Sequence, residues 1–431
     1  MATPSSHQVQ KFNLLPGVHL YYIADPRPKT TSLYLYLHRP LSRTEVTKNA
    51  LLASVLKRGT ATLPDMRAIN LHLEGLFGLL YDIGVTKKGP VQSVSFSFNA
   101  IADQYAGGGL LRSAIDLLMD FLLCPKLVDG AFDPAYVEGE KKNLKDTIES
   151  LVNDKRAYAS YRCLEELCKG DPTGVFEYGY IEDLDSIDAQ NLCTHYQSII
   201  TKSPIDIFVV GDVDIASVIN AFHDRLAGLP LSIAPLQMDA APYGQAGEVR
   251  TVEEAFDVTQ GKLALGLRTD TTASDDDYYA LMVGNSILGA GAHSKLFNNV
   301  REKKSLCYYV GSRIDKFSPI MLISSGIEFD KYQEAKKEIL FQLEAVKKGA
   351  FDKDELEIAK EFIIAQYHSY LDSPYLMQSY YLGLALTGNA DTIADAVQKV
   401  RAVTTEDVIR AFTKVKLDVV YFLKGKEGGA Q

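Results

Sequence analysis

The same order of structural signals occurs twice along this chain of 431 residues. The clearest pair of matching segments is AFDPAYVEGEKKNLKDTIESLVND at 131–154 and AFDKDELEIAKEFIIAQYHSYLDS at 350–373. Each opens with Phe-Asp, whose Asp predicts a helix N-cap, and each continues as a long, charged, amphipathic helix. A repeat of this length predicts two similar domains rather than one continuous fold.

The segments around this pair also recur in the same order. In each half a strand-like alternation precedes an apolar helix, a hairpin-like pair of strands follows, and a helix and a strand close the half. The first strands, the hairpins and the closing segments lie at 30–40 and 261–270, at 78–100 and 305–329, and at 188–211 and 405–425. We therefore predict an α+β fold with two domains, 1–227 and 251–431, joined by a linker rich in Pro, Ala and Gly at 228–250.

Composition narrows the class of protein. The net charge of −10 argues against a nucleic-acid-binding surface, and no apolar run approaches the ~20 residues that a membrane span needs. The N-terminal segment MATPSSHQVQKF has neither a basic start nor an apolar stretch, so no secretory signal is visible. Five cysteines form no CxxC pair, which favours reduced thiols. We expect a cytoplasmic protein that binds neither nucleic acid nor membrane.

Catalytic and metal-binding motifs are scarce. The chain has eight histidines, and no two of them stand at the i, i+4 spacing that places two imidazoles on one helix face. No Gly-x-Ser-x-Gly motif is present, and no cysteine has a convincing histidine partner. The segment KNALLASVLKRGTATLPD at 48–65 predicts an apolar helix that ends at Gly59, with a turn to Pro64, and it contains no His, Glu or Cys. The sequence therefore nominates no metal site.

The segment 294–312 brings an arginine and two tyrosines together. It predicts an amphipathic helix that contains Arg301. A short charged turn and a strand with Tyr308 and Tyr309 follow that helix. Strand alternation sends the two tyrosines to opposite faces, so one of them is expected to face the same space as Arg301. A guanidinium and a phenol placed together bind a carbonyl oxygen or a peptide terminus. Spacing alone favours the alternative, an arginine at a helix end beside a core tyrosine.

At these residues the sequence resembles the second-half signature of the insulinase-like (pitrilysin, M16) metallopeptidases. Their small-subunit members carry Leu-Phe-x-x-Val-Arg-Glu-x-x-x-Leu-x-Tyr, and the matching segment here places Arg301 and Tyr308 at the Arg and Tyr of the motif. The resemblance covers nearly the whole chain, because the family is built from two homologous α+β halves. It implies two α/β sandwich domains, each a mainly antiparallel sheet packed with helices.

The family's zinc motif is HxxEH on a first-half helix, usually followed by a Lys/Arg-Gly-Thr turn. Alignment on the matching turn that begins at Arg58 places Ala50 and Ser54 at the two histidines and Ala53 at the catalytic glutamate. The third ligand, a glutamate of the long downstream helix, aligns with Thr147. Asp146 and Glu149 lie near that position, and Glu140 matches a second acidic position of the family's helix. Alanine offers no donor atom, so the resemblance implies an emptied zinc site and no cofactor in this chain.

In the family the Arg–Tyr pair positions the substrate backbone and stabilises the tetrahedral intermediate. Its retention here, beside a lost zinc motif, implies the non-catalytic subunit of a bacterial heterodimeric peptidase. A paralog with an intact HxxEH would supply the zinc, and this chain would close the chamber and contribute Arg301 and Tyr308 to hold an extended peptide. Two alternatives are a purely structural subunit and a peptide-binding scaffold without a role in catalysis. A third, an independent enzyme with an unrecognised site, is the least favoured because paired His, Cys and carboxylate motifs are scarce. Leader segments of ribosomally made peptides, or a step linked to modification of a translation factor, are the expected substrates.

Overall fold

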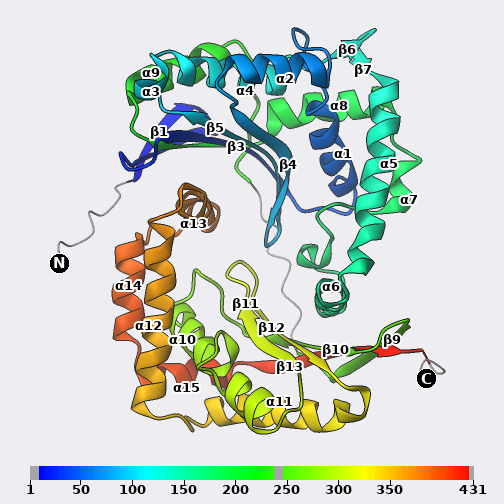
Figure 1. Ribbon diagram of the computed structural model, residues 1–431, viewed down its shortest axis with the longest axis vertical. Helices are drawn as coiled ribbons and strands as arrows, with labels where there is room; N and C mark the ends of the chain where they lie inside the picture. Colours follow the sequence, from blue (N-terminus) through cyan, green and yellow to red (C-terminus); the bar gives the residue numbers. More distant parts are fainter. Residues whose placement is uncertain (1–8, 237–245, 427–431) are drawn as a thin grey trace. The chain divides into compact units, whose positions relative to one another are not determined.

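The computed structural model describes residues 9–236 and 246–426, and this part of the chain forms two compact units (Figure 1). Of the described residues, unit 1 contains 9–149, 175–236 and 373–382, and unit 2 contains 150–174, 246–372 and 383–426. Part of the expected linker, residues 237–245, lies outside the described residues. None of the described helices combines the length and apolar character that crossing a bilayer requires.

Unit 1 is built on a six-stranded sheet in which only β2 and β8 pair in parallel. In spatial order its strands are β1 (Val9–Leu15), β2 (Val18–Ala24), β8 (Ile205–Gly211), β3 (Thr30–Pro40), β5 (Val91–Ile101) and β4 (Leu80–Lys88). The helices of unit 1 include α1 (Val46–Leu56), α2 (Met66–Gly75), α4 (Leu110–Leu123), α5 (Pro134–Ser150), α8 (Ala189–Lys202) and α9 (Ile215–Leu226). Shorter elements connect them: α3 (Asp103–Ala106), β6 (Leu127–Val128), β7 (Ala131–Phe132) and α7 (Ile181–Leu184).

Unit 2 repeats the arrangement with five strands. Their order is β11 (Tyr309–Ile314), β12 (Ile320–Ile327), β10 (Gly261–Arg268), β13 (Lys416–Gly425) and β9 (Arg250–Phe256), and only β13 and β9 pair in parallel. This is the order and direction of β4, β5, β3, β8 and β2 in unit 1. The predicted α+β fold, with two similar halves and mainly antiparallel sheets, is confirmed.

The helices of unit 2 occur in the predicted order along the chain. They include α10 (Tyr278–Gly289), the π-helix η3 (Leu296–Lys303), α11 (Tyr332–Lys347), α12 (Lys353–Tyr370), α14 (Ile393–Ala402) and α15 (Thr405–Thr413). The two predicted N-caps are present. Asp133 Oδ1 accepts a hydrogen bond from the Ala135 amide at 2.9 Å, and Asp352 forms a capping box with Glu355 at the start of α12.

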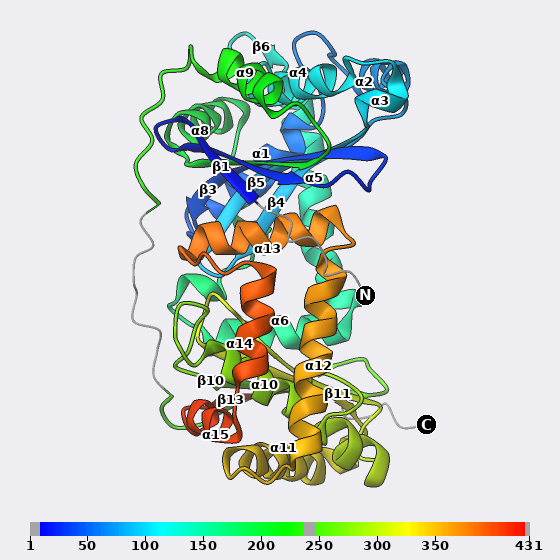
Figure 2. The ribbon, with the colours of Figure 1, turned by 90° about the vertical axis from the view of Figure 1, so that its left-hand side faces the viewer.

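Alternation along the strands separates an apolar face from a more polar one. On β3, Leu33, Leu35 and Leu37 pack in the core beneath the helices, whereas Tyr34 and Tyr36 point to the opposite face. That opposite face is covered by the first part of α13 (Pro374–Thr387) (Figure 2). The Tyr36 hydroxyl donates a hydrogen bond to Gln378 Oε1 of α13 at 3.1 Å.

The sheet of unit 2 is covered in the same way by α6 (Lys155–Leu167). Its side chains Cys163 and Leu167 pack in an apolar cluster with Leu322 of β12 and Tyr421 of β13. Residues 150–174 therefore belong to unit 2 although they lie within 1–227, and 373–382 belong to unit 1 although they lie within 251–431. The prediction that 1–227 and 251–431 are the ranges of two homologous domains is not tested by this division, and it stays a prediction.

Two predicted helices differ in detail from the structure. Helix α1 ends at Leu56 rather than Gly59, because the turn to Pro64 begins sooner. Gly59 is required within that turn, since a Cβ there would lie 2.8 Å from the Pro64 carbonyl oxygen. The predicted amphipathic helix before Arg301 is the π-helix η3, whose buried side chains Leu296 and Val300 anchor it.

Candidate functional site

Helix α1 carries the positions aligned with the HxxEH motif, and they are packed as core. Ala50 and Ala53 are 3% and 1% exposed and belong to the apolar cluster of unit 1. The Ser54 hydroxyl donates to the Ala50 carbonyl oxygen of its own helix at 3.3 Å. None of these three side chains therefore offers a free ligand atom.

The facing positions on α5 are also occupied by internal contacts. Buried Glu140 forms an ion pair with Arg58, and its second oxygen accepts a hydrogen bond from Asn143 Nδ2 at 3.2 Å. Thr147, aligned with the third ligand, donates its hydroxyl to the Asn143 carbonyl oxygen at 2.9 Å. The carboxylate that the chain keeps in this region is thus neutralised by an arginine.

The two other candidates for a third ligand point to solvent. Asp146 is exposed, and Glu149 is exposed and lies 3.8 Å from Lys145. Within residues 9–236 and 246–426, no cluster of three or more His, Cys, Asp or Glu side chains is arranged to hold a metal ion. Zinc requires three such protein donors, so the residues at this site do not fit the metal that the resemblance implies for active relatives.

Arg301 lies near the end of η3 with its side chain 42% exposed. The guanidinium lies 4.8 Å from the centre of the Phe297 ring, and Nε is 3.5 Å from Glu302 Oε1. Ser305 follows in the left-handed region (φ 50°), which turns the chain toward β11. The arginine therefore contacts an aromatic ring one turn back and a neighbouring carboxylate, while its side chain stays partly exposed.

Tyr308 directly precedes β11 and is 58% exposed. Its amide donates to the Gly326 carbonyl oxygen at 2.8 Å, and its hydroxyl donates to Glu328 Oε1 at 3.1 Å. The hydrogen bond to Glu328 and the negative charge of that carboxylate raise the pKa of Tyr308, so at neutral pH the phenol proton is held toward Glu328. Arg301 and Tyr308 are thus two partly exposed polar side chains on a short segment, and each contacts a neighbouring carboxylate.

Tyr309 points to a different environment, as alternation predicts. Its ring lies under Arg156 of α6, with 4.2 Å between the guanidinium carbon and the ring centre. Burial raises the pKa of Tyr309 to about 12. The contact with Arg156 joins residues far apart in sequence, so the sequence contained no signal for it.

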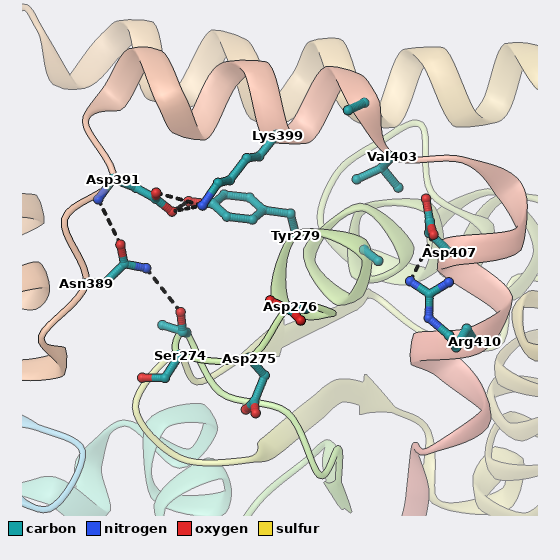
Figure 3. Close-up of a pocket in the computed structure, with 13 residues that line it drawn as sticks. Ser274, Asp275, Asp276, Tyr279, Asn389, Asp391, Lys399, Val403, Asp407 and Arg410 are labelled. Carbon is teal, nitrogen blue, oxygen red and sulfur yellow. Dashed lines mark hydrogen bonds and ion pairs between the residues drawn. The ribbon is translucent and has the colours of Figure 1, made fainter.

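A separate polar pocket of about 360 Å³ lies in unit 2 beside α10 and α14 (Figure 3). The Tyr279 hydroxyl donates to Asp391 at 2.8 Å, and Lys399 pairs with the same carboxylate at 2.7 Å. Arg410 is paired with Asp407 and with Asp277. These charged side chains of the pocket are thus paired with other side chains of the same chain. The pocket therefore has the features of a polar cluster that stabilises unit 2 rather than those of a binding site.

Known proteins resemble this chain over nearly its full length. It is 35% identical over 416 residues to the probable inactive metalloprotease YmfF of Bacillus subtilis (strain 168), with 96% of this chain and 97% of that protein covered. The chain belongs to the M16 peptidase family. Residues 186–363 match the family model described as the peptidase M16 inactive domain.

Two further relatives of this M16 chain are informative. A crystal structure of a conserved protein from Enterococcus faecalis V583 matches with a TM-score of 0.86 and 29% identity, covering 98% of this chain and 99% of that one. The antilisterial bacteriocin subtilosin biosynthesis protein AlbE of Bacillus subtilis is 29% identical over 163 residues, 38% of this chain and 41% of AlbE. The predicted family and its two-domain fold are confirmed.

Proposed function

We propose that this M16 chain is the non-catalytic subunit of a heterodimeric zinc peptidase. A paralog with an intact HxxEH motif supplies the metal and the general base. This chain closes the chamber and contributes Arg301 and Tyr308, which hold the backbone of an extended peptide at the partner's zinc. The complex acts in the cytoplasm on unstructured peptides, such as leader segments of ribosomally made peptides.

The observation that carries the proposal is the contrast between the two halves. In unit 1, Ala50 and Ala53 are packed as core and Glu140 is neutralised by Arg58. In unit 2, Arg301 and Tyr308 match the family motif and are partly exposed polar side chains. A chain that had lost all role in peptide binding would be under no requirement to keep two such side chains at those positions.

Sheet edges give the peptide a place to add as a strand. In the described residues β4 pairs only with β5, and β11 pairs only with β12, so each sheet ends on a strand with one free edge. An extended peptide binds such an edge through main-chain hydrogen bonds, which tolerate many sequences. The similarity to AlbE, named for bacteriocin biosynthesis, supports a peptide as the substrate.

The decisive experiment mixes this chain with an HxxEH-containing M16 paralog from the same genome and follows cleavage of unstructured peptides. We expect cleavage to exceed that of either chain alone. Arg301→Ala is expected to lower kcat by about a hundredfold, because a donor to the developing oxyanion is lost. Tyr308→Phe, which removes only the hydroxyl, is expected to act in the same direction.

The matched control is Arg401→Ala, which removes an equally charged, exposed side chain from α14. It is expected to leave cleavage unchanged. Full activity of the paralog alone, indifferent to Arg301, would instead identify this chain as a structural or peptide-binding scaffold.

A further inference from the structure

Unit 2 contains a second, larger pocket of about 870 Å³, located between the start of α6 and the turn that joins β9 to β10. Its charged lining consists of the cations Lys155, Arg156 and Lys262 and the carboxylates Asp154 and Asp257. The open shape and the three cations within one pocket are features of a site for an anionic group.

The three cations contact neutral groups. Lys155 Nζ donates to the Val152 carbonyl oxygen at 2.6 Å, and Lys262 Nζ donates to the Gln260 side-chain oxygen. Arg156 lies over the Tyr309 ring. In the described part of the chain, none of the three forms an ion pair with a carboxylate.

Other cations of unit 2 show the opposite behaviour. Arg162, one and a half turns further along α6, pairs with Glu254 at 2.7 Å. Arg268 on β10, the strand that carries Lys262, pairs with Asp418 at 3.0 Å. The pocket at the start of α6 thus brings together three cations that, within the described residues, lack such a carboxylate partner.

The two carboxylates that line the pocket do not form ion pairs with its three cations. Asp154 caps α6, since its Oδ1 accepts hydrogen bonds from the Arg156 and Ala157 amides at 3.0 and 2.9 Å. Asp257 is exposed at the mouth. Burial lowers the pKa of Lys262. The negative charge of Asp154 partly offsets this decrease, and the positive charge of Arg156 lowers the pKa further. An incoming anion would relieve that crowding of positive charge.

A glycine makes this arrangement possible. Lys262 of β10, Gly326 of β12 and Tyr309 of β11 lie in register across three strands. A Cβ at Gly326 would lie 2.4 Å from Tyr309 Cε1, so the Tyr309 ring occupies the space above the glycine. There the centre of the ring lies 4.2 Å from the Arg156 guanidinium carbon and 5.7 Å from Lys262 Nζ, so one aromatic ring contacts both cations.

We propose that this pocket binds a carboxylate of the peptide substrate, supplied either by an acidic side chain or by the peptide's C-terminus. The inference rests on the proposed function, because Tyr309 adjoins Tyr308, which is assigned to the peptide backbone. Arg156 supplies a planar guanidinium that matches a carboxylate, and Lys262 supplies a second charge beside it. The pocket thereby selects acidic peptides or fixes the distance from the cleaved bond to the C-terminus.

The test measures binding of the full-length chain to four unstructured peptides, each labelled with an uncharged fluorophore, by fluorescence anisotropy. The peptides carry either two glutamates or two glutamines, each with a free or an amidated C-terminus. We expect a carboxylate-bearing peptide to bind about tenfold more tightly than the amidated glutamine peptide, the gain of one charge-assisted contact. Comparison of the two sources of carboxylate shows which one the pocket uses.

The double variant Arg156→Gln/Lys262→Gln is expected to abolish this preference and to leave binding of the amidated glutamine peptide unchanged. The control Lys336→Gln removes a cation from unit 2 that lies 5.0 Å above the Tyr332 ring, and it is expected to keep the preference. If the double variant does not fold, raising the salt from about 50 mM to about 0.5 M on the wild type must remove the preference selectively.

The outcomes separate the two proposals. Equal binding of all four peptides, or a preference that survives in the double variant, overturns the carboxylate site. Arg301→Ala is expected to weaken all four peptides alike. If it has no effect while the double variant removes the preference, the carboxylate site stands and the assigned role of Arg301 fails. Failure of every peptide to bind overturns both.

Discussion

Single residues on α1 decide whether this half of the chain can carry a metal. Replacing a ligand with alanine removes the donor atom, and the burial of Ala50 and Ala53 shows that the surrounding core has closed on the smaller side chains. The ion pair between Arg58 and Glu140 occupies the remaining polar position. The loss is therefore part of the packing, and a single substitution will not reverse it.

Ala53→Glu tests how completely the core has closed. Restoring a glutamate at this position places a carboxylate in the apolar cluster without a partner, so we expect the free energy of unfolding to fall by about 2–4 kcal/mol. Urea denaturation measures the change. Ser54→Ala on the same helix removes only a bond to the helix backbone and is expected to change stability by less than about 0.5 kcal/mol. Equal stability of the two variants would mean that water still reaches the site.

The identities of these residues could be predicted from the sequence, whereas their contacts could not. The turn at Arg58 was enough to align Ala50, Ala53 and Ser54 with the zinc motif. The ion pair from Arg58 to Glu140 joins residues 82 positions apart, and nothing in the spacing indicated it. The roles of Arg301 and Tyr308 stay predictions, because exposure and motif position alone do not establish substrate binding.

Among the elements, four neighbouring strands of unit 1 are linked by a row of polar side chains. Asp206 of β8 lies 3.1 Å from His19 of β2 and 3.1 Å from His38 of β3. His38 also lies 2.8 Å from the Ser93 hydroxyl of β5. Burial opposes ionisation of Asp206, but the hydrogen bonds to the two histidines outweigh it and lower the pKa of Asp206 to about 2.

This row predicts an acid-dependent stability. A carboxyl with a depressed pKa stabilises the fold at neutral pH, and the contribution, roughly 2 kcal/mol, is lost as pH falls from about 4 to about 2. We expect Asp206→Asn to remove the dependence in that range and to lower stability at pH 7. Chemical denaturation across the pH series measures both effects. Asp82→Asn, which alters an exposed pair with Lys57, is the control expected to change little.

Most elements follow from hydrophobic periodicity and capping, and the exceptions have local causes. Asp133 and Asp352 identified two helix starts because capping is a property of a few adjacent residues. The π-helix η3 was predicted only as an amphipathic helix, since the residue pattern of so short a π-helix does not differ enough from that of an α-helix.

Across the whole molecule, each unit depends on a segment from the other half of the sequence. Residues 150–174 complete the apolar cluster of unit 2, and residues 373–382 complete unit 1. Local patterns identify helices, but they carry no information about which of two sheets an amphipathic helix covers. For this reason the sequence predicted two domains without the exchange.

Separating the halves should therefore destabilise both. We expect residues 1–236 and 246–431, expressed as two chains, to fold poorly alone and to recover their secondary structure and cooperative unfolding when mixed. Circular dichroism during thermal unfolding measures this. Cooperative unfolding of either fragment alone at the temperature of the intact chain would show that the exchanged helices contribute little.

The exchange also imposes an order in time on synthesis. When residue 239 has left the ribosome, unit 1 still lacks the segment 373–382, which follows about 130 residues later. At ~5–20 residues per second, one face of its sheet waits on the order of ten seconds for its covering helix. During this interval the face that carries Tyr34 and Tyr36 is exposed, so the yield of this protein is expected to depend on the translation rate of its second half and on chaperones that act on nascent chains.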